Sequence, residues 1–494
     1  MVSAELATNR VADAPGVPRR ADGLFLVAIA LLCLVLPLIF LGDATQELSE
    51  LALVGQWLVL AYAGVHLAVL LRRGAPLWFD TMFWAFSYGW IGLAGWAQMT
   101  ARLNPYDVSI STSTYERAAM LALVGFLAYD LGKVLLKPRN LPTADPQGRR
   151  VSPGRTLVLG VVTLASMPVL VLLLGGPASF LAPRSQRTAG LSASGLITDE
   201  SKVTGGILLA VTNALPLVAL LAVIAVLQTH RELRRRPSWI ALLVLLGSVT
   251  LFVGNPISNP RFWTGTIILS ILFSLFRTST ARGYRVTLSA VLLALLVVFP
   301  YADRYRYADE VAVSQPLGYL FVNKLDYDAS VQMSNVIDYV DATGGTHGHQ
   351  LLGVAGFFVP RSLWSEKPVN TGALLTQFVG FPQTNVSSPL WVETYTDGGL
   401  LLVATFFVLL SMAATWAQRF RGRAPGRSVT WAMLVTPAVA AYSVVLLRGS
   451  LLSGIGAFWV ILGISWFATS PTESLRRRRR RAPGSAARTR VSVR

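Results

Sequence analysis

Hydrophobic residues along this chain come in blocks of about twenty, separated by polar segments that are mostly short. As an α-helix, a block of that length crosses the ~30 Å hydrocarbon layer of a membrane. The pattern predicts about twelve membrane spans. They are residues 24–41, 51–71, 79–99, 116–136, 156–174, 205–227, 238–256, 261–277, 284–302, 399–418, 430–448 and 450–468. The expected fold class is therefore an all-α integral membrane protein.

One polar segment, residues 303–398, is far longer than the other connections. It divides an N-terminal bundle of nine predicted spans, residues 1–302, from the spans in residues 399–468, and a basic tail, 469–494, follows. Within it, residues 328–340 place apolar side chains near one helical face, which predicts a short amphipathic helix on the bundle or at the lipid headgroups. We expect the functional residues here, because a long connection between spans is where multi-pass proteins carry them.

Composition supports the membrane assignment. Of the 494 residues, 53% are hydrophobic and only 14% are charged, which argues against a soluble globular domain. The one cysteine, Cys33, lies in the first apolar block, so no intrachain disulfide is expected. No signal peptide is evident, and the first block is long enough to remain as a membrane anchor.

The net charge of +18 is distributed unevenly along the chain. With the N-terminus in the cytoplasm, most of the 43 Lys and Arg residues fall on the cytoplasmic side of the predicted spans. This predicts a plasma-membrane protein with both termini in the cytoplasm and residues 303–398 on the outer face. The arginine run 476–481 is expected to contact anionic lipid headgroups. Alternatively, it is a disordered stop signal that fixes the orientation of the protein in the membrane. Nucleic acid is not an expected partner, because no folded module surrounds the run.

Some basic residues on the outer side stand out by their positions, and they are Arg184, Arg261, Arg361, Lys367 and Arg448. Arg261 follows a proline-rich turn at the start of a span, and Arg448 lies in an apolar hairpin where an arginine needs a partner. Guanidinium groups bind phosphate oxygens through paired donors, so the set predicts a phosphate or diphosphate site. Snorkelling or salt bridges better explain any one arginine, whereas Arg261, Arg361 and Arg448 as a group favour the anion site.

A repeated spacing links two of the outer connections. Ten residues separate Arg361 from Gly372, and ten separate Arg184 from Gly195. Because glycine is common, the spacing alone is a weak signal. What makes it of interest is that the two copies lie in the third and fifth outer connections.

Four residues are candidates for accepting a proton: His347, His349, Glu393 and Asp397. A neutral imidazole or a carboxylate can serve as a general base, although the histidines also suit a polar loop tip. Other carboxylates of the segment are alternatives, and they include Asp326, Asp328, Asp338, Asp341 and Glu366. The two histidines have no third ligand at a diagnostic spacing, and we expect neither a metal nor another cofactor.

Several motifs of this region together resemble the large external loop of the Wzy-type O-antigen and oligosaccharide repeat-unit polymerases. They are KLDYD from Lys324, NVIDYV from Asn335, GHQLLG from Gly348, PRSLWSEKP from Pro360 and ETYTDGG from Glu393. The paired Arg-x10-Gly elements look like the two described for such polymerases. The resemblance covers mainly residues 255–450 and is most specific at PRSLWSEKP.

The resemblance implies a metal-independent, GT-C-like glycosyltransferase on the outer face of the membrane. Its donor and acceptor would be undecaprenyl-diphosphate-linked oligosaccharides, and its partners a flippase and a chain-length regulator. A hydroxyl of one lipid-linked repeat would attack the anomeric carbon of another chain, with the lipid diphosphate leaving. Such chemistry needs two substrates oriented and diphosphate charge neutralised, which suits arginines at the membrane surface.

Two other functions remain as hypotheses. One is a different outer-face glycosyltransferase, either a ligase or an enzyme using a polyprenyl-phosphate sugar, although the first outer connection, GDATQELSE, has no adjacent acid pair. The other is a transporter or flippase, against which stand the long outer segment and the absence of symmetric interrupted spans in the hydropathy.

Overall fold

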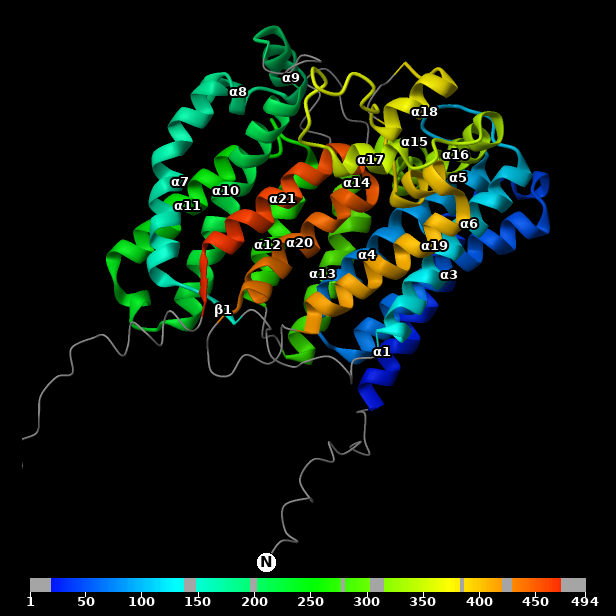
Figure 1. Cartoon of the computed structure of the whole chain (residues 1–494). Helices are drawn as coiled ribbons and strands as arrows, with labels where there is room; N and C mark the ends of the chain where they lie inside the picture. The colour runs from blue at the N-terminus through cyan, green and yellow to red at the C-terminus, as the bar shows by residue number, and fades with distance from the viewer. Residues whose placement is uncertain are drawn as a thin grey trace, which may run out of the picture.

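The computed structural model describes residues 19–136, 148–195, 202–276, 280–302, 315–382, 386–419 and 429–471 (Figure 1). Residues 472–494, which hold nearly all of the predicted basic tail, lie outside the described residues, as do 1–18 and the start of the long polar segment, 303–314.

The described part of the chain contains eight helical segments long and apolar enough to cross a membrane. They are α1 (Arg19–Ala30) continued by η1 (Leu31–Val35) and α2 (Leu36–Ile39), α3 (Glu50–Arg73), α6 (Thr112–Leu135), α7 (Pro153–Leu173), α10 (Lys202–Thr229), α13 (Ala281–Leu293) continued by η6 (Ala294–Val298) and α14 (Phe299–Tyr301), α19 (Leu390–Arg419) and α20 (Trp431–Arg448). The structure thus agrees with the expected class, an all-α membrane protein.

The remaining apolar helices match the other predicted spans in position but differ in length or continuity. Three are shorter, namely α11 (Pro237–Val253), α12 (Arg261–Leu275) and α21 (Leu451–Phe467). Residues 79–99 are covered by α4 (Trp78–Phe86), the π-helical η3 (Ser87–Leu93) and α5 (Ala94–Ala101). Every residue from 80 to 100 is buried, so protein rather than lipid surrounds this central helix.

Of the three hydrophobic clusters among the described residues, the two largest divide the bundle into halves. The first is built mainly from α1 to α6, α13, α16 (Ala329–Thr343) and α19, and the second from α7, α10, α11 and α21. Helices α12 and α20 pack against each other and contribute buried residues to both cores, so they form the seam between the halves (Figure 1).

The most extensive helix pairing in the described part of the chain joins α6 and α19. At Gly132, an added Cβ would overlap the carbonyl of Val408 on α19, so only glycine permits this approach. Small residues at such crossings are how membrane helices pack without a hydrophobic driving force between them.

The two ends of the bundle differ. One end, here called the loop end, carries the short helices α8 (Gly176–Leu181), α9 (Arg184–Ala193), α15 (Leu317–Asn323), α16 (Ala329–Thr343), α17 (His349–Ala355) and α18 (Thr371–Val379) (Figure 1). The other, the strand end, carries β1 (Arg149–Val151), which pairs antiparallel with β2 (Thr469–Pro471) with Arg149 opposite Pro471. Three 3₁₀ turns complete the described elements: η2 (Thr45–Glu47), η5 (Leu233–Arg235) and η7 (Leu325–Tyr327).

The helix predicted over residues 328–340 is α16, and it lies deeper than a headgroup-level helix. Every residue from 329 to 337 is buried, including Gln332 and Asn335. It packs against α5, α6, α18 and α19, which cover its polar as well as its apolar side chains. Of the two placements expected, packing on the bundle is therefore the one observed.

Candidate functional site

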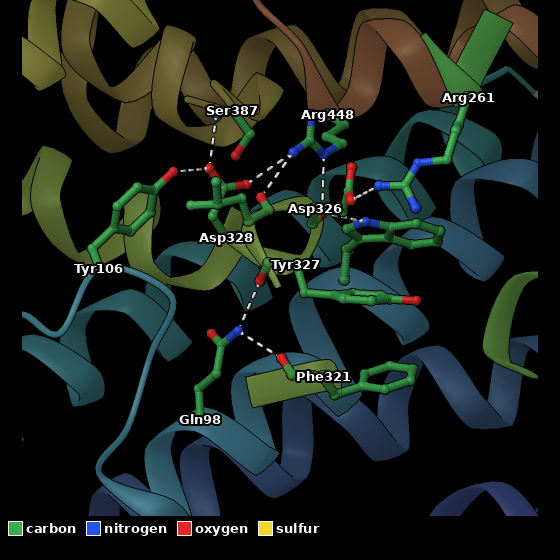
Figure 2. A network of polar contacts seen from close by, with 11 residues as sticks. Gln98, Tyr106, Arg261, Phe321, Asp326, Tyr327, Asp328, Ser387 and Arg448 are labelled. Atoms are coloured by element: carbon green, nitrogen blue, oxygen red, sulfur yellow. Dashed lines mark hydrogen bonds and ion pairs between the residues drawn. The ribbon is translucent and has the colours of Figure 1, made fainter. Parts of the chain in front are cut away.

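Two arginines from the seam helices meet at one short turn of the long polar segment (Figure 2). Arg261 is the first residue of α12, and Arg448 is the last of α20. Arg261 forms an ion pair with the carboxylate of Asp326. Arg448 donates from Nε to the Asp326 carbonyl at 3.0 Å and from Nη2 to Asp328 Oδ1 at 3.2 Å. Helix ends far apart in sequence thus place two cations against Asp326 and Asp328.

The carboxylate of Asp328 is the most enclosed part of this network. It is 0% exposed, and besides Arg448 it accepts hydrogen bonds from the Tyr106 hydroxyl at 2.7 Å and the Ser387 N–H at 2.9 Å (Figure 2). Burial and the adjacent Asp328 charge raise the pKa of the Tyr106 phenol, so it stays a donor. A buried carboxylate is stable only when paired and hydrogen-bonded in this way.

The central helix holds the same turn from the other side. Gln98 Nε2 donates to the carbonyls of Phe321 and Tyr327 at 3.0 and 2.9 Å, and Trp90 Nε1 donates to the Asp326 carbonyl at 2.8 Å. The ring of Tyr327 stacks on that of Phe321 with centroids 4.3 Å apart. Buried amide and indole donors therefore fix the backbone that presents both aspartates.

Asp326 and Asp328 balance the charge of the two arginines, but the hydrogen bonds at the site do not occupy every donor of Arg448. Arg448 is 18% exposed as a side chain and Arg261 is 9% exposed. The contacts of Arg448 use Nε and Nη2, which leaves Nη1 without a partner in the described part of the chain. The two guanidinium groups also lie over the rings of Phe262 and Phe299, at 4.9 and 5.0 Å respectively. An anion reaching this site would meet an available donor on a cation that is already oriented.

Arg361 and Lys367 have a different setting from the one expected of phosphate ligands. Arg361 donates to the carbonyls of Lys367 and Pro368 at 2.6 and 3.0 Å, and Lys367 Nζ donates to those of Phe357 and Val359 at 2.7 and 2.8 Å. Burial, with a contribution from Arg361, lowers the pKa of Lys367. Both side chains brace their own loop, and within the described residues neither contacts the Arg261–Arg448 pair.

Arg184 is exposed at the start of α9, and the buried arginine of that connection is Arg187. Arg187 lies over the ring of Phe180 at 4.0 Å and donates to Asn259 Oδ1 at 3.2 Å. Burial lowers its pKa to about 10. It therefore ties α9 to the turn that precedes Arg261, a role that the sequence spacing did not single out.

Glu393 lies beside the arginine pair, beneath the turn that joins α20 to α21. It is 1% exposed, and its Oε1 accepts a hydrogen bond from the Leu451 N–H at 3.1 Å. The hydroxyls of Ser388, Ser450 and Thr371 surround the carboxyl group. No basic side chain of the described chain pairs with Glu393, and its Oε2 is a buried acceptor with no hydrogen bond of regular geometry there. Ser388 also donates its N–H to the Arg448 carbonyl at 3.0 Å, which links the two groups.

Asp397 is engaged as a helix cap. Its Oδ1 accepts from the Thr346 hydroxyl and from the Gln350 N–H at 3.1 Å, and its Oδ2 accepts from the Leu351 N–H at 2.6 Å. These donors belong to the first turn of α17 and the residues before it, so the carboxylate satisfies N–H groups that the helix leaves unpaired.

The two histidines lie near the same cap but on the surface. His347 is exposed with a left-handed φ of 50°, and His349 is exposed at the start of α17, with its ring edge-on to Trp364 at 6.3 Å. Neither is joined to the arginine pair by a contact among the described residues. Within that part of the chain, no three His, Cys, Asp or Glu side chains are grouped to hold a metal ion.

Sequence reasoning named Arg261 and Arg448 as phosphate ligands and Glu393 as a possible base. It named Asp326 and Asp328 only as alternative bases, not as partners of the arginines. It missed Tyr106, Gln98 and Trp90, whose partners lie more than two hundred residues along the chain, at separations of 222, 229 and 236. No local pattern marks these residues.

No family model matches this chain, and no match was found among curated proteins or among solved structures.

Proposed function

We propose that this protein joins polyprenyl-diphosphate-linked oligosaccharide repeat units into a surface polysaccharide on the outer face of the plasma membrane. The convergence of Arg261 and Arg448 on Asp326 and Asp328 supports this most strongly. It places two fork-shaped cations at the end of a membrane bundle, on the KLDYD motif that resembles the repeat-unit polymerases.

The proposal includes the full span count and its orientation. The eight long segments, the three shorter helices and the central helix α4–η3–α5 would make about twelve crossings. The loop end would face outward and the strand end the cytoplasm, because basic residues concentrate in the connections at the strand end.

The reaction follows from the chemistry of the substrate. A hydroxyl of the acceptor repeat attacks the anomeric carbon of the donor, a glycosidic C–O bond forms, and the C–O bond to the diphosphate breaks. The diphosphate leaves with its electron pair, so the protein has mainly to orient two lipid-borne chains and neutralise the leaving group. Arg448, with its available Nη1, and Arg261 would bind the diphosphate, while Asp326 and Asp328 hold both guanidinium groups in place.

Glu393 is our preferred acceptor for the proton of the attacking hydroxyl. It lies next to the Arg448 turn, and its Oε2 has unused accepting capacity. Because Glu393 is buried, the proton would have to reach it through the hydroxyls of Ser388, Ser450 or Thr371. His347 and His349 form the surface alternative, and Asp397 is the weakest candidate since its oxygens already cap α17.

The test is to incubate the purified protein with a polyprenyl-diphosphate-linked oligosaccharide and size the products. Arg448→Lys and Arg261→Lys keep the charge but remove the fork, and each should slow polymer formation by about 100-fold. Arg117→Lys is the matched control, because Arg117 makes a two-point ion pair with Asp341 at the loop end, 2.8 Å from Nη2 to Oδ1, away from the site. Wild-type protein that gives no product longer than the substrate would overturn the proposal, and unchanged ladders in both lysine variants would remove the arginine pair from it.

A transporter or flippase is the second candidate, and one observation favours it. Helix α19 is interrupted at Gly398 and Gly399, where Gly399 has φ 59°, a few residues from buried Glu393. Interrupted helices beside buried polar groups occur at transporter binding sites. Flipping of the same lipid-linked oligosaccharide in proteoliposomes without a new glycosidic bond would decide for this function, and transfer to an acceptor without a lipid carrier would decide for a ligase.

A further inference from the structure

An apolar groove runs between α7 and α21 near the strand end, far along the bundle from the arginine pair. It is lined by Leu159, Val162, Gly463, Ile464 and Phe467, and its volume is about 290 Å³. Val162 and Phe467 are 51% and 46% exposed, so the groove opens on the side of the bundle. Its volume and apolar lining suit a segment of one hydrocarbon chain.

Two arginines lie at the strand-end limit of this groove. Arg155 is one helical turn before Leu159, and its Nη1 donates to the carbonyls of Phe467 and Thr469 at 3.5 and 2.7 Å. Arg149, on β1, donates from Nη2 to the carbonyl of Trp466 at 3.0 Å and lies 3.9 Å over the Trp466 ring. The β1–β2 pairing thus fixes both guanidinium groups where α21 ends.

Within the described residues, no carboxylate balances these two cations. In the described part of the chain, neither Arg149 nor Arg155 pairs with a carboxylate; both donate to backbone carbonyls instead. Burial lowers the pKa of Arg149, and the nearby charge of Arg155 lowers it further, because two positive groups held close together repel each other. An anion placed between them would relieve this repulsion.

We infer that the groove and the two arginines form a binding site for one anionic phospholipid. One acyl chain lies against Leu159, Val162 and Gly463, and the phosphate contacts Arg149 and Arg155 at headgroup level, beside Trp466. Indole rings favour this level of the bilayer, and basic pockets between membrane helices bind anionic headgroups. The occupant is a lipid of the leaflet at the strand end, distinct from the diphosphate proposed at the loop end.

The experiment uses the full-length protein in bilayer discs of phosphatidylcholine, with and without phosphatidylglycerol. Native mass spectrometry counts bound lipid, and thermal unfolding reports stabilisation. Phosphatidylglycerol should be retained by the wild type, and the double variant Arg149→Gln/Arg155→Gln should bind it about 30-fold more weakly, from the usual contribution of two basic side chains. Arg285→Gln is the matched control, because Arg285 also donates to backbone carbonyls, those of Leu71 and Arg72, at 2.8 and 2.9 Å.

A second pair of variants tests the groove itself. Gly463→Leu should fill the groove and remove the retained lipid, and the backbone there has room for a side chain, since nothing lies within 4 Å of an added Cβ. Gly247→Leu is the control, because Gly247 is not among the groove residues and an added Cβ there also has no atom within 4 Å. Equal retention of the two lipids by the wild type, or equal losses in the test and control variants, would overturn the site.

Discussion

At the scale of residues, the Arg448–Asp328 pair should cost more free energy to break than an ordinary surface ion pair, because breaking it leaves a charge that is buried and unpaired. Asp328 is 0% exposed and has three donors, whereas Asp341, paired with Arg117, is 51% exposed. Removing the charge from a buried pair leaves its partner unpaired in a poorly solvated place. The Asp328 pair is therefore expected to matter for stability as well as for holding Arg448.

Asp328→Asn should lower the free energy of unfolding by about 3 kcal/mol, because Arg448 loses its counter-charge and one of the donors to Asp328 meets an amide N–H₂. Asp341→Asn should change it by less than about 1 kcal/mol, since that pair is solvated. Thermal unfolding of the purified proteins in one detergent measures both. Equal shifts in the two variants would contradict the distinction between a buried and an exposed pair.

At the scale of elements, the Asp397 carboxylate of α19 is bonded directly to the first turn of α17. Asp397 lies just before the interruption of α19 at Gly398 and Gly399, and it caps the first turn of α17. The cap fixes the position of the turn that carries His347 and of His349 at the start of α17. A residue that the sequence indicated as a possible base thus has a structural task in the fold.

Asp397→Asn should lower the unfolding free energy by about 1–3 kcal/mol, because the Leu351 N–H then loses a charge-assisted acceptor. Product formation should persist below the new unfolding temperature. The comparison is Asn370→Ala, which removes the neutral cap that Asn370 provides to Ala373 at the start of α18 and should cost about 1 kcal/mol. If Asp397→Asn abolished product formation with unfolding unchanged, Asp397 would return as the leading candidate for the base.

At the scale of the whole molecule, the seam helices α12 and α20 connect two cores and end in the two arginines of the site. The positions of the two arginines therefore depend on how the two halves of the bundle pack against each other. The same arrangement separates the loop end, with its short helices, from the strand end, where Arg149 and Arg155 lie.

Cysteine labelling in whole cells tests the proposed orientation and span count. The native Cys33 is buried, so it should give little background. Glu366→Cys and Ile257→Cys should react with a membrane-impermeant maleimide, whereas Glu232→Cys and Arg282→Cys should react only after permeabilisation. Ile257 and Glu232 flank α11, so labelling of both from the same side would show that this shorter helix does not cross the membrane.

The sequence by itself determined the class of this protein and the location of its helices, because a block of about twenty apolar residues has few stable choices other than a membrane-crossing or buried helix. It also marked Arg261 and Arg448, since an arginine beside hydrocarbon needs a partner. It did not separate a helix that faces lipid from one that protein surrounds, as α4–η3–α5 shows, because both environments accept the same apolar side chains. The partners of the arginines, the enclosing of Asp328 by Tyr106 and Ser387, and the use of Asp397 as a cap came only with the tertiary structure. These contacts join segments hundreds of residues apart, and they depend on how the helices pack rather than on any local pattern.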